Sequence, residues 1–216
     1  MKPARFQSTL RHPLNSIFTS ERYVRVLRVL FRHGGALGTT RVARDAGLSR
    51  FGAREALRSL VEIGIVEAMG SGNSIIYRAN MRHPMAVAVE QLFDAEGKQT
   101  DAIIDAVKQA VDTSEIVGAW LYGSFARGED RIDSDLDIAV ATAGPDSPAL
   151  DRLRERLDEA GDRLHFSPSV VGFDCMDATR LSKGDPWWGS LVREAIVIKG
   201  GRPETLIARS KAAAHA

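Results

Sequence analysis

The sequence contains little cysteine and no long apolar run. Cys175 is the single cysteine among 216 residues, which excludes an internal disulfide and fits a reducing cytoplasm. No apolar stretch approaches the roughly 20 residues that a membrane-spanning helix needs, and the first residues lack the apolar segment of a signal peptide. The five histidines show no spacing that suits a metal site. We therefore expect a cytoplasmic protein without membrane contact, in which Cys175 is a small, partly buried apolar residue.

The sequence also has almost no net charge, but its charges are unevenly distributed. The formal net charge is +1, yet residues 1–95 hold 14 Lys and Arg against 7 Asp and Glu. The remaining residues hold 15 basic against 21 acidic side chains. At this length the chain has room for two small domains. A basic first half suggests an anionic partner such as nucleic acid.

The most informative stretch is residues 116–140. It opens with a continuous apolar run, residues 116–122, which predicts a buried strand. Gly123-Ser124 ends that strand. A second strand is expected to begin near Asp135, and its period of two places Asp135 and Asp137 on the same face.

Two carboxylates this close repel each other, and a divalent cation removes the repulsion. Mg²⁺ takes oxygen ligands, usually one or two carboxylates together with substrate phosphates. Gly123 lets the backbone approach an anion, and Ser124 offers a hydroxyl and an N–H. A helix that begins at this turn would add a favourable dipole. The residues therefore predict a site for a cation-bridged polyphosphate.

At this point the sequence resembles the DNA polymerase beta-like nucleotidyltransferase superfamily. A Gly-Ser pair, ten residues and then Asp-x-Asp are its signature, and residues 126–128 match the fuller Gly-Ser-x-Ala-Arg-Gly form of minimal nucleotidyltransferases. The resemblance implies Mg²⁺ or Mn²⁺ and a nucleoside triphosphate, for which we expect ATP. It implies transfer of a nucleoside monophosphate with release of pyrophosphate. It assigns Asp135 and Asp137 as catalytic metal ligands, and the expected nucleotide contacts are Gly123, Ser124, Arg127 and Ser134.

Two features of this resemblance leave alternatives open. Arg127 would either neutralise phosphate charge or brace the loop. The family has a third carboxylate in the middle of the next core strand, and the matching position here holds Ser169. Asp174 could replace it only in another register. Nucleotide binding is thus expected, whereas turnover without the third carboxylate is an open question.

The first half of the sequence has a pattern that predicts a helix-turn-helix. A helix capped by Ser20 ends at Gly34-Gly35, a short helix over residues 41–46 is capped by Thr39 or Thr40, and Ser49 caps a third helix that runs to about residue 63. Two short strands, residues 63–68 and 74–78, then flank a Gly-rich turn. This order resembles a winged helix of the MarR/ArsR-like kind over residues 20–80.

The winged-helix resemblance implies double-stranded DNA as a partner. The third helix would enter the major groove with Ser49, Arg50 and Arg54 nearest the bases. Arg58 repeats the same spacing along the helix, and Arg78 of the wing would lie over the DNA backbone or the minor groove. The alternative is a winged helix used for protein contact or dimerisation. A homodimer is also expected, because two copies read a palindrome.

The remaining segments complete a mixed α+β organisation. Periodicity predicts a helix over residues 147–160, a strand over 164–173, a helix or turn over 176–183, a helix opened by Pro186 and a strand or helix end over 195–198. Trp187 and Trp188 are expected in the core, with base stacking as the alternative. In order, the chain would comprise an arm with little regular structure, a winged helix-turn-helix, a linker helix interrupted at Gly97, an α/β nucleotidyltransferase domain with a small mixed sheet, and a flexible tail. The corresponding ranges are 1–19, 20–83, 84–100, 101–208 and 209–216.

Three functions follow from this organisation. The first is a nucleotidyltransferase that modifies a protein, an RNA or a small molecule, with the winged helix for targeting or autoregulation. The second is a DNA-binding transcriptional regulator whose nucleotidyltransferase-like domain binds nucleotide without turnover. The third is one member of a toxin–antitoxin-like pair, because minimal nucleotidyltransferases often occur with partner proteins.

Overall fold

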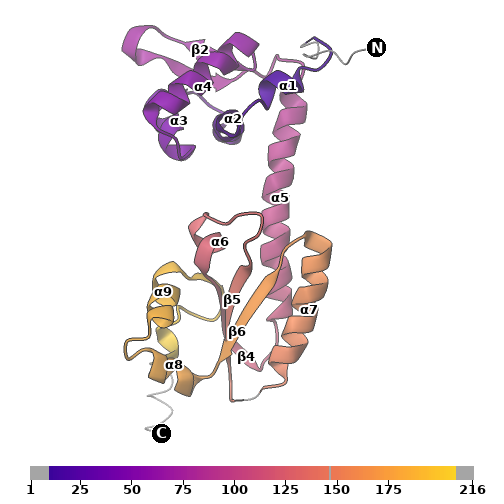
Figure 1. Cartoon of the computed structure of the whole chain (residues 1–216), viewed down its shortest axis with the longest axis vertical. Helices are drawn as coiled ribbons and strands as arrows, with labels where there is room; N and C mark the ends of the chain where they lie inside the picture. Colours follow the sequence, from indigo (N-terminus) through magenta and orange to yellow (C-terminus); the bar gives the residue numbers. More distant parts are fainter. Residues whose placement is uncertain (1–9, 146, 208–216) are drawn as a thin grey trace. The chain divides into compact units, whose positions relative to one another are not determined.

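The computed structural model describes residues 10–145 and 147–207, and these residues form two compact units that are divided between Gly97 and Lys98 (Figure 1). The mixed α+β class predicted from the sequence is confirmed. The predicted tail and the first nine residues of the predicted arm lie outside the described residues. Among the described helices, none combines the length and the apolar character that crossing a membrane requires.

The first unit is mainly helical, with a small sheet. Its helices pack through the apolar sides of α2 and α4, where Val26, Leu27 and Leu30 lie in one buried cluster with Leu57 and Leu60. Burial of these side chains is what holds short helices together in water. The elements are α1 (Leu14–Ile17), α2 (Glu21–His33), β1 (Leu37–Gly38), α3 (Thr39–Asp45), α4 (Arg50–Ile63), β2 (Val66–Met69), η1 (Gly72–Ser74), β3 (Ile76–Ala79) and the first part of α5 (Ala86–Ala110).

The helix ends in this unit follow the expected capping chemistry with two exceptions, and the arm differs from its expected lack of regular structure. The Ser49 hydroxyl accepts the Gly52 N–H at 3.0 Å, so the predicted cap of α4 is confirmed. Ser20 holds the N-cap position of α2, but its hydroxyl makes no capping bond and is buried without a partner among the described residues. The short third helix begins at Thr39 with Gly38 as its N-cap, two residues before the predicted start. The arm also contains a helical turn, α1, which is fixed by the buried Ile17.

The predicted hairpin is confirmed as an antiparallel pair. Strands β2 and β3 pair from Val66 opposite Ala79 to Met69 opposite Ile76. The two residues of β1 add a third strand on the other side of β3, with Leu37 opposite Tyr77. Two-residue strands carry no readable alternation, so the sequence did not indicate β1.

The predicted interruption at Gly97 is wrong, because α5 runs without a break from Ala86 to Ala110. A glycine inside a helix costs only about 1 kcal/mol relative to alanine. Apolar residues on either side of it, such as Phe93 and Val107, are buried and outweigh that cost. The boundary between the two units falls inside this helix.

The second unit is built on a four-stranded mixed sheet in the order β6-β5-β4-β7. Strands β5 and β6 are parallel, and the other two pairs are antiparallel. The strands are β4 (Ile116–Leu121), β5 (Leu136–Thr142), β6 (Pro168–Phe173) and β7 (Ile196–Lys199), and the helices are α6 (Gly123–Arg127), α7 (Ala149–Leu164), α8 (Cys175–Leu181) and α9 (Pro186–Glu194). The predicted strand or helix end over 195–198 is therefore a strand, and α7 extends four residues beyond its predicted end.

The two faces of the sheet bury different clusters. Leu136, Ile138 and Val140 of β5 pack with α7 on one face, whereas Ala139 and Ala141 pack on the other face with the cluster of α8 and α9. Figure 1 shows α7 on one side of the sheet and α8 and α9 on the other. Because side chains alternate along β5, Asp137 points to the face of α8 and α9.

The aromatic residues of α9 belong to this second cluster. Trp188 is 6% exposed, and Trp187 makes edge contacts with Tyr122 at 5.8 Å and with Phe173 at 5.7 Å between ring centroids. The prediction that the tryptophans lie in the core is confirmed for Trp188, whereas Trp187 is half-buried and packs against the same cluster. Cys175 is a partly buried member of the same cluster, as expected.

Candidate functional sites

The turn after β4 brings the Gly-Ser pair against the carboxylate of Asp137. Gly123 opens α6 with a φ of 71°, a left-handed conformation that favours glycine. A Cβ atom at this position would overlap the carboxylate of Asp137. Two constraints therefore require glycine at this position: the positive φ angle and the lack of space for a Cβ atom beside the Asp137 carboxylate. The predicted turn and the predicted acidic strand do lie side by side.

The two carboxylates of the Asp-x-Asp pair differ in their surroundings. Asp135 precedes β5 and is exposed, whereas Asp137 is half-buried within β5. Burial raises the pKa of Asp137, and the charge of Asp135 raises it further. A hydrogen bond from Ser169 and the positive charge of Arg127 act in the opposite direction. The pair thus concentrates negative charge in a place where the protein alone compensates it incompletely.

Ser169 lies beside Asp137, at the position where the resemblance expects a third carboxylate. It is the direct partner of Asp137 in the parallel pairing of β5 and β6, and its hydroxyl donates a hydrogen bond to the Asp137 carboxylate. The register read from the sequence therefore agrees with the structure at this pair. The site has a neutral hydroxyl where a third acid would stand.

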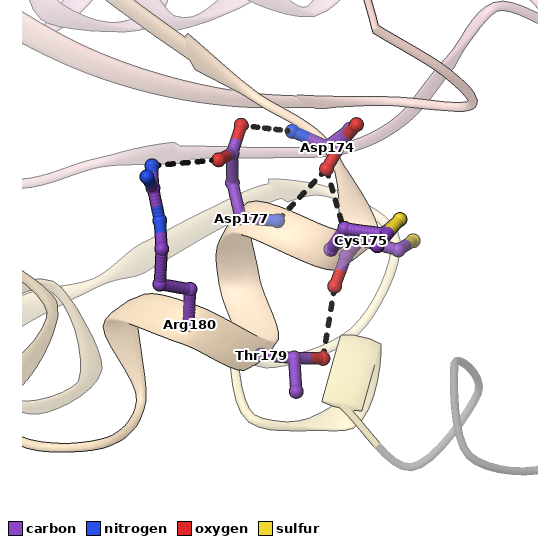
Figure 2. Close-up of polar contacts among 6 residues, drawn as sticks. Asp174, Cys175, Asp177, Thr179 and Arg180 are labelled. Carbon is purple, nitrogen blue, oxygen red and sulfur yellow. Dashed lines mark hydrogen bonds and ion pairs between the residues drawn. The ribbon is translucent and has the colours of Figure 1, made fainter.

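Asp174 cannot replace that acid, because it caps α8 (Figure 2). Its carboxylate accepts the N–H groups of Met176 and Asp177, each at 2.8 Å, and Asp177 completes a capping box. Asp177 also accepts a hydrogen bond from Arg180 at 2.8 Å. Asp174 follows Ser169 by five residues, about 16 Å along a strand. The Asp174 cluster is therefore part of the scaffold.

Arg127 is held by two carboxylates of its own unit. Its guanidinium donates to Glu129 at 2.8 Å and to Glu194 at 2.6 Å, and both contacts raise its pKa. Glu194 comes from α9, so the pair ties the end of α6 to that helix. Of the two roles open for Arg127, this geometry favours bracing of the loop. Glu194 was not singled out from the sequence, where 67 residues separate it from Arg127.

The loop before β5 contains the fourth expected nucleotide contact, Ser134. Its hydroxyl accepts the Arg131 N–H at 2.9 Å, and its own N–H donates to the Arg131 carbonyl at 2.9 Å. These bonds close a tight turn that places Asp135 at the start of β5. Ser134 thus shapes the loop in this structure, and Ser124 is half-buried in α6.

A pocket of about 640 Å³ lies next to the acidic pair but on the opposite side of the sheet from Asp137. Asp135, Leu136, Phe125 and Phe166 line it, and Leu136 belongs to the face that packs on α7. Asp137 and Ser124 are not among its lining residues. Of the two acids, Asp135 alone is among the residues that line this pocket.

The carboxylate oxygens of Asp135 and Asp137 are the kind of ligand that Mg²⁺ binds. Within residues 10–145 and 147–207, no group of three or more His, Cys, Asp and Glu side chains is placed to hold a metal. Two adjacent carboxylates nevertheless suffice for Mg²⁺ when a substrate supplies phosphate oxygens. The raised pKa of Asp137, caused by burial and by Asp135, is the electrostatic situation that a divalent cation relieves.

The expected DNA contacts fall into two groups. Ser49, Arg50 and Arg54 lie on the first two turns of α4, and both arginines are exposed. Neither has an ion-pair partner within the described parts of the chain. By contrast, Arg58 pairs with Glu62 at 3.3 Å.

Arg78 is also neutralised within its own domain. It pairs across the wing with Glu67 at 2.8 Å, and the two residues face each other in the β2–β3 register. The structure thus leaves free positive charge at the start of α4.

One exposed side chain at the start of α4 was not identified from the sequence. Phe51 is 73% exposed on α4, outside the apolar stripe of that helix.

Two family models match separate parts of the chain. Residues 103–174 match the family described as polymerase beta, nucleotidyltransferase. Residues 19–69 match the family described as the IclR helix-turn-helix domain. The first match contains the Gly123 turn, both carboxylates and Ser169, and the second contains α2, α3 and α4.

Several solved structures align with about half of the chain. The AntR antimony-specific transcriptional repressor is 19% identical with a TM-score of 0.36, covering 47% of this chain and 91% of its own. A toxin–antitoxin with AMP-PNP is 21% identical with a TM-score of 0.35, covering 53% of this chain and 86% of its own. A mutant of the toxin–antitoxin MntA-HpeT is 18% identical with the same TM-score and the same coverage. No curated protein matches the chain.

Proposed function

We propose that this chain, which joins an IclR-type winged helix-turn-helix domain to a polymerase beta-type nucleotidyltransferase domain, is a metal-dependent nucleotidyltransferase that binds DNA. The donor would be a nucleoside triphosphate, ATP in our proposal, and the acceptor a protein, an RNA or a small molecule. The observation that carries the enzymatic part is the contact between the Gly123 turn and Asp137, with Asp135 two residues away.

In this proposal Asp135 and Asp137 would hold Mg²⁺ or Mn²⁺. When bound, the cation supplies positive charge for the triphosphate and for the group that attacks it. Gly123 leaves room for phosphate oxygens against the backbone, and Ser124 offers a hydroxyl at the start of α6. Ser169 and Arg127 both favour the ionised form of Asp137, which is the form that can accept a cation.

The enzymatic part is tested with the full chain, Mg²⁺ and a panel of triphosphates labelled at the α-phosphate. We expect release of pyrophosphate and label transfer to an acceptor, both lost in Asp135→Asn/Asp137→Asn. The matched control is Asp130→Asn/Asp133→Asn, which removes two acids of the same loop outside the pair. Equal turnover by the wild type and by Asp135→Asn/Asp137→Asn would contradict the proposal.

A second function is favoured by the hydroxyl of Ser169 beside Asp137. Without a third acid at this place, the domain would bind nucleotide and regulate transcription without turnover. Bound nucleotide would then change the affinity for DNA, and bound DNA would change the affinity for nucleotide by the same factor. If the wild type binds ATP with Mg²⁺ and never releases pyrophosphate, this sensor replaces the enzyme as our proposal.

The DNA-binding part is supported by the free charge at the start of α4. We propose that α4 enters the major groove of double-stranded DNA with Arg50 and Arg54 in contact. Arg50→Ala/Arg54→Ala should abolish sequence-selective gel shifts. Arg58→Ala is the matched control, because this arginine already has Glu62 as its partner. An unchanged shift in the double variant would remove α4 from the groove.

Two further properties belong to the same proposal. A protein that uses DNA and triphosphates works in the cytoplasm, which agrees with its single cysteine.

A homodimer would present two α4 helices to the half-sites of a palindrome. Sedimentation of the full chain with and without DNA measures this directly, and a monomer on a single half-site would contradict it.

A further inference from the structure

Phe51 exposes an aromatic ring at the start of α4. It is the second residue of the helix, and 73% of its surface is exposed. The neighbouring Gly52 and Ala53 are buried, and the helix packs through Ala56, Leu57 and Leu60 on its other side. The ring therefore contributes nothing to the core of this domain. A phenylalanine in such a place is also a mediocre helix former, so helix propensity does not account for it.

The charges around Phe51 separate it from an ordinary exposed apolar residue. Seven of the twelve described arginines of this domain have a carboxylate partner, namely Arg25, Arg28, Arg32, Arg41, Arg44, Arg58 and Arg78. Arg50 and Arg54, which precede and follow Phe51, have none among the described residues. Arg54 is three positions along the helix, so its side chain lies on the same side as the ring. An apolar ring between two uncompensated cations suits a ligand that carries negative charges along its edges and has an apolar group between them.

Double-stranded DNA has that combination in its major groove. The phosphates carry the charge, and the 5-methyl group of thymine is the apolar feature that protrudes among the base edges. A phenyl ring has no conventional hydrogen-bond donor or acceptor, so the methyl group is what it can distinguish. We propose that Phe51 is a specificity-determining residue that contacts a thymine methyl group. This inference rests on the proposed entry of α4 into the major groove.

The experiment begins with selection of a binding site from a random duplex pool by the full chain. Each thymine of the selected site is then replaced by uracil, which removes only the methyl group. For the wild type we expect about a fourfold loss of affinity at one thymine per half-site, the value for burial of one methyl group. Phe51→Ala should bind the thymine and uracil forms of that site equally, and Phe51→Leu should keep part of the difference.

Two controls separate this inference from the proposed function. Phe51→Ala should keep the salt dependence of binding, because it removes no phosphate contact, whereas Arg50→Ala should lower the slope by about one. Because Phe51 is exposed, the thermal unfolding of Phe51→Ala should match that of the wild type. If the full chain selects no DNA, the proposed function fails and this inference with it.

Other outcomes overturn this inference alone. Wild type and Phe51→Ala that show the same loss at every uracil would mean that the ring does not read the methyl group. A variant that loses dimerisation with an unchanged methyl profile would assign Phe51 to contact with a second copy. In both cases DNA binding through α4 would stand.

Discussion

Two pairs of acids flank the parallel strands of the second unit, and they have opposite surroundings. Asp135 and Asp137 lie at the start of β5, and Asp174 and Asp177 follow the end of β6. Backbone N–H groups and Arg180 satisfy the second pair. The first pair retains a half-buried carboxylate, that of Asp137, whose pKa is raised by burial and by its neighbour Asp135. The partners of a carboxylate, more than its position next to a strand, therefore separate a structural acid from a candidate ligand.

Removing the charge of Asp137 should have the largest effect on nucleotide binding. We expect Asp137→Asn to weaken Mg²⁺-nucleotide binding by at least about 100-fold, because one of two metal ligands is lost. The same variant should unfold at a higher temperature, since it removes a partly buried charge beside Asp135. Calorimetric titration and thermal unfolding measure the two effects.

Asp177→Asn is the matched control at the other end of the strands. It should bind nucleotide as the wild type does. Loss of binding in this control, or full binding by Asp137→Asn, would break the distinction between the two pairs.

The pH dependence of binding should follow the ionisation of Asp137. Its pKa lies above the ordinary aspartate value of 3.8, so binding should already weaken at a pH where an ordinary aspartate is still ionised. The folded protein holds this proton more tightly than the unfolded chain, so the contribution of Asp137 to stability falls as the pH rises through the same interval.

Two variants sharpen that prediction. Ser169→Ala removes the hydrogen bond that lowers the pKa and should move the midpoint of binding to higher pH. Asp135→Asn removes the repulsion, and NMR titration of the Asp137 carboxyl should then show a lower pKa. Identical titration curves for the wild type, Ser169→Ala and Asp135→Asn would mean that a group other than Asp137 causes the pH dependence.

Loss of the cap at Asp174 should affect stability and leave the candidate site intact. Asp174→Ala removes a hydrogen-bonded N-cap, which typically costs about 1 kcal/mol. Urea unfolding should show this loss, and nucleotide affinity should not change. Asp158→Ala, on the exposed side of α7, serves as a control without a capping role. Weaker nucleotide binding by Asp174→Ala would connect the far end of the strands to the site.

The smallest effect is expected at Glu194, the partner of Arg127 from α9. Arg127 is exposed and keeps Glu129 as a second partner, so Glu194→Gln should weaken nucleotide binding by no more than about twofold if Arg127 braces the loop. Stronger binding would instead mean that the released guanidinium contacts phosphate. Glu204→Gln, which removes an exposed acid paired with Arg202, is the matched control. Fluorescence titration with a labelled nucleotide resolves the two outcomes.

The strand–turn–strand of the second unit could be predicted because its signals are local. The apolar run into Gly123 and the alternation after Asp135 each depend on neighbours in the sequence, and Ser169 follows from the next strand. The capping of α4 by Ser49 and the hairpin of the wing are local in the same way.

What could not be predicted depends on distant partners. The bond from Arg127 to Glu194 and the pair of Arg78 with Glu67 need the folded chain to bring them together. The two residues of β1 are a strand only because β3 is beside them. Gly97 reads as a break by local propensity, and the buried residues on both sides of it overrule that preference.

The fit of Gly123 against the carboxylate has a consequence for the variation that this chain can tolerate. Even alanine at this position would meet both an unfavourable backbone angle and a carboxylate where its methyl group must go. A second change at residue 137 could clear the space but would discard the proposed ligand. In a deep mutational scan selected for nucleotide use, position 123 should thus accept one amino acid alone, with no compensating partner.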